Sequence, residues 1–467
     1  MKRKLKILYV SAEIAPYANA GGLGEVARSF PEALLETGNF EVVRVMPLYK
    51  NVKCNLEYVT DFSVPMGQGY ETCVVKRDRE EKAIPTYFIA GDRYYYREQI
   101  YAYEDDGLRF FFFCRAILQM LKTISFQPDI VHTNDWHTGF LPLLLKKELP
   151  KIKTVYTIHN IAYQGFIAAD YLKDYLSEAE KIELGYPQWL NFMKAGILYS
   201  DLVTTVSPGY GEEILLEDKG HGMTELLEKR RDSFVGILNG IDMKHYSPAA
   251  DPMLVFPYDL EHLEIKKKNR TWIRNRYGLP DTDIPLLAMI TRLDYSKGID
   301  IVLKAISYSR LSTYQLIILG SGQPYYHGML SNISATYGEN IVVDFQYNEA
   351  LAKQIYAAAD IYLMPSLFEP CGLGQMYAMR YGAVPLVNPV GGLKDTVISE
   401  EQNKILATGF HMEQWSGEAL AKELERIIAA YHSEEWKRYI ENGMKQDHSW
   451  NRSIAEYEKY YRSLLRV

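Results

Sequence analysis

A carboxylate followed by small residues is the first feature of the sequence that could do chemistry. In the segment 365–382, Glu369 is followed by Pro370 and Gly372, and then by an apolar run over 375–381 that indicates a helix. Proline suits the first turn of a helix, and glycines let a ligand approach free backbone N–H groups. Such a site suits a hydroxyl-rich group joined to an anion, for example a sugar on a diphosphate. An ordinary strand–loop–helix junction explains the local pattern equally well.

Two cations lie in one loop of the same half of the chain. Arg292 and Lys297 follow an expected strand over 285–290. Fixed cations at a strand end suit a diphosphate leaving group, whose developing charge must be stabilised in the transition state. Two solvated charges are an equally good local explanation. Further along, Gly320 and Gly322 predict a tight turn that also lets a base or ribose approach.

A glycine-rich loop near the N-terminus is a third candidate. An expected buried strand over 6–11 leads through Asn19, Gly21 and Gly22 into a helix that carries Glu25 in its first turn. This layout presents amide N–H groups to phosphate. The spacing is not G-x-G-x-x-G, so it is no dinucleotide fingerprint. Taken alone, the loop is explained as well by a tight strand–helix turn.

The elements that position these residues alternate between strand and helix, which predicts parallel, doubly wound sheets. Ligands bind such sheets beyond the carboxyl ends of the strands, where several strands here end in polar residues. Those residues are His132, Asn134, Asp135, His137, His159, Asn160, Ser207, Asn239 and Asp242. In the first half, strands are expected over 6–11, 41–47, 86–90, 129–133, 153–159, 202–207 and 234–239, and helices over 108–124 and 189–199. In the second half, strands are expected over 285–290, 314–319, 340–345, 360–364 and 383–388, and helices over 299–307 and 453–465.

Length and composition set the limits of these hypotheses. The 467 residues are 47% hydrophobic and 24% charged, which is an ordinary globular composition long enough for two large domains. A net charge of −7 argues against broad binding of nucleic acid or anionic membranes. Four scattered cysteines without a C-x-x-C pair indicate a reducing compartment and no zinc site. No apolar run reaches transmembrane length.

Together these motifs resemble the bacterial glycogen synthases and plant starch synthases. The resemblance covers nearly the whole chain, and its specificity comes from many motifs in the family's order. The matching segments are 20–25, 134–137, 157–165, 194–196, 204–208, 222–230, 237–242, Arg292 with Lys297, 369–373 and 391–397.

The resemblance implies a retaining glucosyltransferase of the GT-B fold, in which two doubly wound Rossmann-like α/β domains face an interdomain cleft. Glucose would pass from ADP-glucose to the non-reducing end of an α-1,4-glucan such as glycogen. Neither a cofactor nor a catalytic metal is expected, and no nucleic-acid or membrane partner. The expected location is cytoplasmic. The expected parts are an N-terminal domain over 1–242, a donor-side domain over 243–446 and a C-terminal helix over 447–467 that returns to the first domain.

Carried over by resemblance, each site residue receives an expected role. Arg292 and Lys297 would hold the diphosphate, and Glu369 with the nearby amides would position glucose. Asp135 would line the catalytic centre near the acceptor, and His159 would contact the donor sugar. The expected donor-binding residues are Asn19, Gly21, Gly22, Glu25, Asn239, Gly320, Gly322, Cys371, Gly372, Leu373 and Thr396. The expected acceptor contacts are Tyr95, Tyr96, Trp136 and His137.

One departure from the family pattern matters. The family's usual Lys-x-Gly-Gly-Leu reads Asn19-Ala-Gly-Gly-Leu23 here. Asparagine can hydrogen-bond a phosphate but brings no charge, so weaker donor binding or a changed nucleotide preference is expected. Three alternatives stay open: a UDP-glucose donor, a small acceptor as in maltose 1-phosphate synthesis, and a catalytically weakened glucan-binding paralogue.

Overall fold

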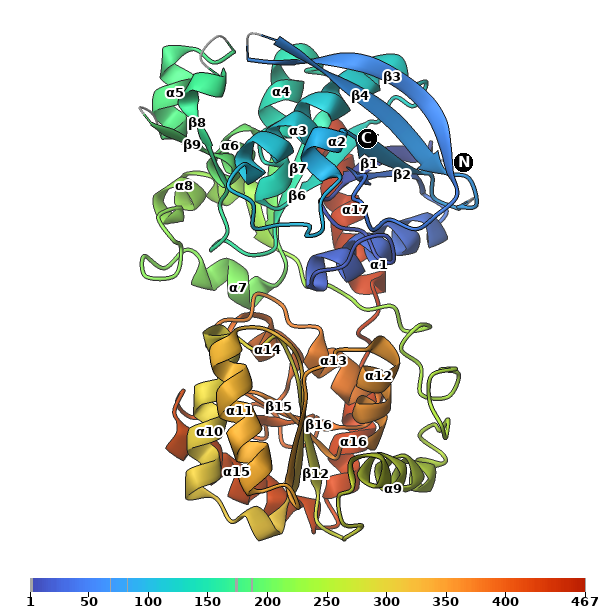
Figure 1. Cartoon of the computed structure of the whole chain (residues 1–467), viewed down its shortest axis with the longest axis vertical. Coiled ribbons are helices and arrows are strands. Elements are labelled where there is room, and N and C mark those ends of the chain that lie inside the picture. Colours follow the sequence, from blue (N-terminus) through green and yellow to red (C-terminus); the bar gives the residue numbers. More distant parts are fainter. Residues whose placement is uncertain (1–2, 68, 82, 173–174, 186–187, 467) are drawn as a thin grey trace. The chain divides into compact units, whose positions relative to one another are not determined.

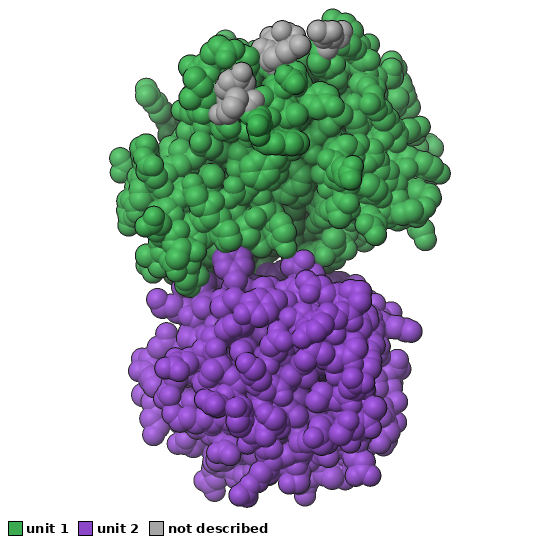
Figure 2. Space-filling view, turned by 60° about the vertical axis from the view of Figure 1, so that its left-hand side comes forward, with its two compact units in different colours: residues 1–240, 450–467 green, residues 241–449 purple. Residues whose placement is uncertain are grey.

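The computed structural model describes residues 3–67, 69–81, 83–172, 175–185 and 188–466. The chain divides into two compact units, which are coloured separately in Figure 2. Unit 1 comprises Met1–Gly240 and Trp450–Val467, and unit 2 comprises Ile241–Ser449. The sequence-based domain limits, after residues 242 and 446, stay predictions. Among the described residues, no helix has the length and apolar character needed to cross a membrane.

Unit 1 is built on a nine-stranded sheet in the order β11-β10-β7-β6-β1-β2-β5-β4-β3 (Figure 1). The seven strands from β11 to β5 are parallel, and they are apolar because helices cover both of their faces. In the register, Ile7 of β1 pairs with Val42 and Ile130 on its two sides. The parallel strands are β1 (Leu5–Val10), β2 (Phe40–Pro47), β5 (Thr86–Ala90), β6 (Ile130–Asn134), β7 (Lys153–Ile158), β10 (Leu202–Thr205) and β11 (Phe234–Gly236).

An antiparallel hairpin extends this sheet, and the sequence analysis did not predict it. Strand β3 (Leu56–Met66) pairs with β4 (Gly69–Asp78), which pairs antiparallel with β5. Most side chains of β3 are exposed or half-buried, with Val64 as its one fully buried residue among those described. The hairpin therefore lacks the continuous apolar run by which the parallel strands were recognised.

The helices of unit 1 follow the predicted alternation with one correction. The expected helix over 189–199 is wrong at its start, because Trp189–Asn191 forms β9, which pairs with β8 (Phe166–Ala168). The helix α6 begins only at Phe192, where the Asn191 side chain accepts a hydrogen bond from the Lys194 N–H. The other helices are α1 (Gly22–Glu36), α2 (Asp92–Tyr95), α3 (Asp106–Thr123), α4 (Leu141–Glu148), α5 (Glu178–Leu184), α7 (Pro208–Glu213) and α8 (Thr224–Lys229).

The C-terminal helix α17 (Asn451–Leu465) belongs to unit 1 by its contacts. The Trp450 indole N–H donates to Ser29 Oγ at 2.9 Å, and its ring lies 5.1 Å from that of Phe30. Tyr461 OH is hydrogen-bonded to His132 Nδ1 at 2.6 Å. The last helix of the chain therefore packs on the first helix and the centre of the unit 1 sheet.

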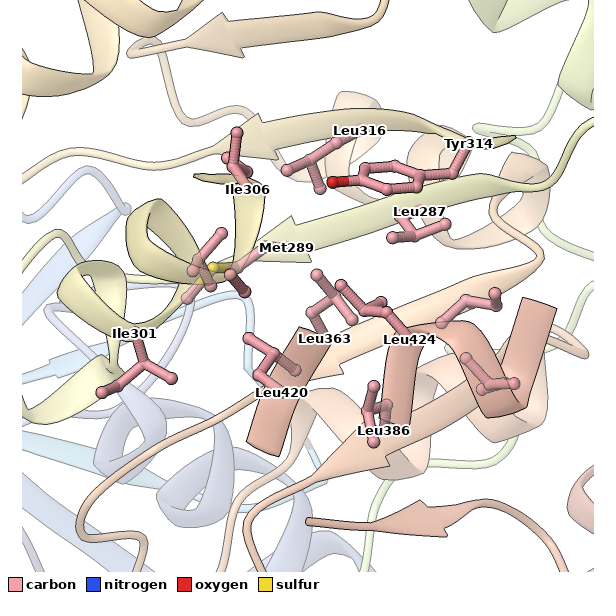
Figure 3. Close-up of a cluster of buried hydrophobic side chains, with 14 of the residues drawn as sticks. Leu287, Met289, Ile301, Ile306, Tyr314, Leu316, Leu363, Leu386, Leu420 and Leu424 are labelled. Carbon is pink, nitrogen blue, oxygen red and sulfur yellow. The ribbon is translucent and has the colours of Figure 1, made fainter. Parts of the chain in front are cut away.

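Unit 2 contains a six-stranded, wholly parallel sheet in the order β14-β13-β12-β15-β16-β17. Figure 3 shows the core on one face, where Leu287, Leu363 and Leu386 of the strands meet Leu420 and Leu424 of α15. The strands are β12 (Leu286–Ile290), β13 (Gln315–Leu319), β14 (Ile341–Asp344), β15 (Ile361–Met364), β16 (Val384–Val387) and β17 (Phe410–His411). The helices are α9 (Lys266–Tyr277), α10 (Ile299–Tyr308), α11 (Pro324–Thr336), α12 (Glu349–Ala358), α13 (Gly374–Arg380), α14 (Gly391–Thr396), α15 (Gly417–Tyr431) and α16 (Trp436–Lys445).

Each unit is thus an α/β domain with a parallel, doubly wound sheet, as the sequence predicted. The strand order of each sheet reverses next to its first strand, β1 or β12. That reversal is the topological switch point at which open α/β sheets bind ligands. The loops after β1 and β12 carry predicted site residues in both units.

Candidate functional site

The glycine-rich loop of unit 1 leads from β1 into α1. Helix α1 begins at Gly22 with Gly21 as its N-cap, and no side chain caps it. Asn19 Nδ2 donates to Glu25 Oε1 at 3.2 Å, while Arg28 Nη2 lies 3.3 Å from Glu25 Oε2. The structure therefore brings the four predicted donor residues of this loop together, with Asn19 held by Glu25.

Asp135 occupies the strained turn after β6. Its φ is 55° and its ψ is 179°, a conformation that is costly for any residue other than glycine. The side chain is buried, and its Oδ1 accepts the N–H groups of His159 at 2.8 Å and Asn160 at 3.2 Å. Burial raises the pKa of Asp135 to about 7, while these two N–H groups act in the opposite direction. Such strain is typical of a functional position.

His159 is held as a neutral donor. Its Nε2 lies 2.9 Å from Asn134 Oδ1, which also accepts the Tyr9 hydroxyl at 3.0 Å. Asn134 Nδ2 donates to the Val10 carbonyl at 3.0 Å, so its oxygen is the atom that faces His159. Burial lowers the pKa of His159 to about 3. The Nε2 proton is therefore committed to Asn134, and Nδ1 is the ring nitrogen left as an acceptor. The sequence placed Asn134 at a strand end but gave it no role.

Asn239 lies beside this group. Its side chain is 6% exposed, and its N–H donates to the Val206 carbonyl at 3.1 Å. It shares a cavity of about 10 Å³, room for one water, with His159 and Asn134. The structure therefore brings these residues together on the unit 1 side. The rest of the lining is Tyr9, Val26, Phe30, His132, Thr157, Trp450 and Tyr457.

Two rings that follow β6, those of Trp136 and His137, form a stack with Tyr101, which precedes α3. The ring of His137 lies 4.1 Å from that of Trp136 and 4.7 Å from that of Tyr101, at interplanar angles of 30° and 29°. His137 Nδ1 has no hydrogen-bond partner among the described residues, and burial holds the pKa of His137 well below its usual value. His137 is only 6% exposed and is stacked on both other rings, so its predicted contact with a glucan is corrected: it supports the stack from within, and the half-buried Trp136 and Tyr101 are the rings suited to a sugar face. Tyr101 was not among the predicted contacts.

Two neighbouring tyrosines differ in their fitness as acceptor contacts. Tyr96 is 67% exposed, and its contact with a glucan stays a prediction. Tyr95 is fully buried, and its hydroxyl donates to the Arg109 carbonyl at 2.8 Å. The prediction for Tyr95 is therefore corrected: it packs in the core beside Phe112 and offers no face to a sugar. Consecutive tyrosines do not reveal from sequence which rings point outward, because this depends on the short helix α2 (Asp92–Tyr95).

The loop after β12 supplies the charged groups of unit 2. Lys297 Nζ forms a 2.7 Å ion pair with Glu369 Oε2, and Ser366 Oγ donates to the same oxygen at 3.0 Å. The two side chains are 15% and 10% exposed, so water screens them little. Arg292 is exposed; its carbonyl accepts the Asp294 N–H at 3.1 Å, but its guanidinium forms no hydrogen bond or ion pair with a described residue. The structure thus joins Lys297 to Glu369 and leaves Arg292 available to an anion.

The turn after Glu369 corrects one expectation. Pro370 does not lie in the first turn of a helix, because α13 begins only at Gly374. Between them Gly372 has a φ of +71°, where an L side chain is strained. The N–H groups of Gly372 and Leu373 donate to no described residue. The amide donors that the sequence predicted beside the carboxylate are therefore present and free.

Gln375 holds this turn in place. Its Nε2 donates to the carbonyls of Cys371 and Gly372 at 3.1 and 3.0 Å, and to Thr396 Oγ1 at 2.9 Å. Thr396 is 3% exposed and donates in turn to the Gly392 carbonyl. Thr396 and Cys371 therefore support the turn from within, and direct donor contacts by either stay predictions. Sequence reasoning missed Gln375, which looked like an ordinary helix residue.

The predicted turn at Gly320 and Gly322 exists, and packing alone requires its glycines. A Cβ on Gly320 would lie 1.9 Å from the Thr291 carbonyl oxygen, and one on Gly322 would lie 2.4 Å from that of Leu293. Both glycines thus allow the loop after β13 to lie against the loop that holds Arg292. Contact with a nucleotide stays a prediction.

Groups that could hold a metal were sought in the described ranges, and no cluster of three or more His, Cys, Asp or Glu residues was found there. The two carboxylates of the segment 281–283, which precedes β12, belong to no such cluster among the described residues, and Asp281 has a structural role. Asp281 accepts Arg274 Nη1 at 3.1 Å and the Thr271 hydroxyl at 3.2 Å.

Comparisons with known proteins agree with this architecture. A family model described as the starch synthase catalytic domain matches residues 6–229, and one described as glycosyl transferases group 1 matches residues 270–446. A glycogen synthase of Moorella thermoacetica is 42% identical over 100% of this chain and 98% of its own length. One of Geobacillus stearothermophilus is 37% identical over 99% and 98%.

Solved structures give the same result. The catalytic domain of starch synthase IV from Arabidopsis thaliana, bound to ADP and acarbose, matches with a TM-score of 0.93 at 30% identity, covering 99% of this chain and 100% of that one. A sucrose-phosphate synthase of Thermosynechococcus elongatus matches with a TM-score of 0.65 at 20% identity and shows the fold alone.

Two Rossmann-like domains with these strand-end residues define a GT-B glycosyltransferase. The chain belongs to the glycogen synthase and starch synthase family, and it is a hexosyltransferase that acts on a nucleotide sugar and a glucan.

Proposed function

We propose that this enzyme transfers glucose from ADP-glucose to the non-reducing end of an α-1,4-glucan, with retention of configuration and without a metal. The observation that carries the choice of donor is the 30% identical starch synthase structure, which is bound to ADP and acarbose. In this chain, the exposed Arg292 and the free N–H groups of Gly372 and Leu373 provide the cationic and amide donors that such a donor needs.

In the proposed mechanism, unit 2 holds the donor. Arg292 and Lys297 bind the diphosphate, and their charge stabilises the leaving group as the glycosidic bond breaks. Glu369, fixed by Lys297 and Ser366, accepts hydrogen bonds from glucose hydroxyls. The amides of Gly372 and Leu373 orient the sugar. Gly320 and Gly322 admit the nucleoside.

Unit 1 supplies the acceptor side and the residues nearest the reacting carbon. Trp136, whose ring is supported by the buried His137, and the exposed Tyr96 bind the terminal glucose units of the glucan. Asp135, ionised above about pH 7, stabilises positive charge that develops on the sugar in the transition state. His159 and Asn239 contact the donor sugar. The leaving phosphate takes the proton of the attacking hydroxyl, which explains why no nucleophile–base pair is needed.

The loop of unit 1 sets the donor preference. Gly21, Gly22 and their free N–H groups face phosphate, with Asn19 and Glu25 beside them. Because Asn19 brings no charge, the affinity for the donor is lower than it would be with lysine. A cytoplasmic location is part of the same proposal, and cell fractionation tests it.

The test is glucose transfer to glycogen from ADP-glucose and, separately, from UDP-glucose, each with and without EDTA. Transfer from ADP-glucose that survives EDTA is expected. A preference for UDP-glucose would overturn the donor assignment, and loss of activity in EDTA would overturn metal independence. Product analysis with and without a glucan primer separates polymer elongation from transfer to a small acceptor. Glycogen binding without any transfer would favour a weakened paralogue.

A further inference from the structure

One buried carboxylate of unit 1 touches two segments to which we assign different substrates. Glu13 follows β1 and is 4% exposed. Its Oε2 accepts the N–H of Ala20 in the glycine-rich loop, and its Oε1 accepts the Tyr101 hydroxyl at 2.6 Å. The proposed mechanism gives Glu13 no role, and the sequence analysis did not select it.

On the acceptor side, Glu13 fixes one end of the ring stack. Tyr101 is held at its hydroxyl by Glu13 and on its face by His137, which stacks in turn on Trp136. Burial and the neighbouring Glu13 hold the pKa of Tyr101 well above its usual value, so the hydroxyl stays a donor. If Glu13 moves, the end of the stack loses its polar anchor.

On the donor side, Glu13 fixes a loop that has few other bonds. The N–H groups of Asn19 and Gly21 donate to no described residue, whereas the N–H of Ala20 between them donates to Glu13. The Asn19 side chain adds one 3.2 Å bond to Glu25. The Ala18 N–H donates to the Ile14 carbonyl at 3.0 Å, so the bond from Ala20 to Glu13 is the next one that holds the backbone before Gly21 and Gly22.

We propose that Glu13 is a positioning residue that couples the donor loop to the acceptor stack, so that neither is displaced without the other. A carboxylate suits this role because each of its two oxygens accepts one of the two donors. Glutamine has one oxygen and one NH₂ group, so Glu13→Gln can keep its oxygen on the Ala20 N–H only by turning its NH₂ to Tyr101, whose hydroxyl must then accept instead of donate. The expected change in the KM values rests on the proposed function. The expected change in hydrogen exchange does not.

The first test needs no substrate. Hydrogen exchange is measured for the full-length wild type, Tyr101→Phe, Glu13→Gln and a control, Tyr175→Phe. The control removes a chemically equal bond, from Tyr175 OH to Glu148 Oε1 at 2.7 Å, outside the site. Tyr101→Phe is expected to speed exchange in peptides covering residues 18–24 as well as around residue 101. Exchange that rises only around residue 101 would overturn the coupling.

The second test separates positioning from a purely structural role. Tyr101→Phe removes no group from the donor loop, yet it is expected to raise the KM for ADP-glucose several-fold, and the KM for glycogen about tenfold. Adding Tyr101→Phe to Glu13→Gln is expected to cost little more than Glu13→Gln alone, because both break one network. Independent, additive effects, or a donor KM unchanged within twofold in both single variants, would overturn the proposal.

The two tests also separate this inference from the proposed function. If the wild type transfers no glucose from ADP-glucose, the proposed function fails, while the exchange experiment still decides the role of Glu13. If Glu13→Gln unfolds, as a thermal melt would show, Tyr101→Phe alone still gives both readouts. Tyr175→Phe is expected to leave both KM values within twofold of the wild type.

Discussion

The two units carry site residues of opposite electrostatic character. In unit 1, burial keeps His159 neutral, with its pKa lowered to about 3, and raises the pKa of Asp135 to about 7. In unit 2, Lys297 and Glu369 form an ion pair, and Arg292 is exposed. Around His159, unit 1 is thus organised by hydrogen bonds among uncharged side chains, whereas the unit 2 site is organised by formal charges.

This difference matches the chemistry of the two proposed substrates. A glucan is neutral and is recognised by ring faces and placed hydroxyl partners, which a rigid, buried network provides. A nucleoside diphosphate is an anion and is recognised by cations and free amides. Substitutions in unit 2 are therefore expected to act through charge, and those in unit 1 through position.

The largest effect is expected from removing a charge from the unit 2 site. Lys297→Ala removes a cation from the leaving group and leaves Glu369 with Ser366 as its remaining partner among those assigned above. We expect kcat to fall about 10²–10³-fold in steady-state assays, the range for losing one group that stabilises transition-state charge. Lys422→Ala is the control, because it removes an exposed ion pair with Glu413 at 2.8 Å. A kcat within threefold of the wild type would remove Lys297 from the mechanism.

The second prediction concerns the titration of Asp135. If the ionised form is active, kcat falls as the pH drops below about 7, because a carboxyl with a raised pKa is protonated there. Asp135→Asn keeps an oxygen for the His159 and Asn160 N–H groups but cannot ionise. It is expected to lower kcat about a hundredfold and to abolish this limb of the pH profile. An unchanged profile would assign the titration to another group.

Asp135→Asn, which is expected to lower kcat, is expected to raise the stability of the fold. The folded-state pKa of Asp135 lies above its unfolded value, so the folded state holds a proton that the unfolded state has lost. The stability it contributes is complete below the unfolded pKa of about 4 and is lost as the pH rises through about 7. Asp135→Asn is therefore expected to raise the Tm more at pH 8 than at pH 5. A lower Tm at pH 8 would contradict the assigned cost of the buried charge.

The sequence predicted the charged site of unit 2 more completely than the site of unit 1, for a physical reason. Arg292, Lys297 and Glu369 stand at strand ends beside glycines, and the apolar strands that place them are visible as continuous runs. In unit 1 the roles depend on side-chain direction. Tyr95 is buried and Tyr96 exposed, although they are adjacent, and the helical α2 that sets this was not predicted.

The residues that the sequence did not reveal are those that hold other site residues in place by hydrogen bonds. Glu13, Asn134 and Gln375 are buried supports whose side-chain partners lie 3 to 125 positions away in the chain. No local spacing marks such contacts, because the fold brings them together. The β3–β4 hairpin was missed because its half-exposed strands lack an apolar run.

A third prediction sharpens the comparison by moving charge into unit 1. Asn19→Lys adds a cation to the glycine-rich loop, and it is expected to lower the KM for ADP-glucose about three- to tenfold with little change in kcat. Asn39→Lys is the control, because Asn39 is another exposed asparagine of unit 1 whose amide donates to a glutamate, Glu458. An unchanged donor KM would show that residue 19 does not contact donor phosphate.

The smallest effect on activity is expected from the hydrogen-bonded network of Tyr461, His132 and Thr157 inside unit 1. Tyr461→Phe removes the partner of His132 Nδ1, whose other nitrogen is bonded to Thr157 Oγ1 at 2.6 Å. Burial lowers the pKa of His132 to about 3, so the ring stays neutral and cannot recover the lost bond by charging. We expect the free energy of unfolding to fall by about 1–2 kcal/mol, with the KM values for both substrates within twofold of the wild type.

Denaturant unfolding measures the free energy of unfolding, with Tyr460→Phe as the control. A large rise in either KM without loss of stability would show that α17 affects substrate binding directly. The uncharged network of the unit 1 site would then extend to the C-terminal helix.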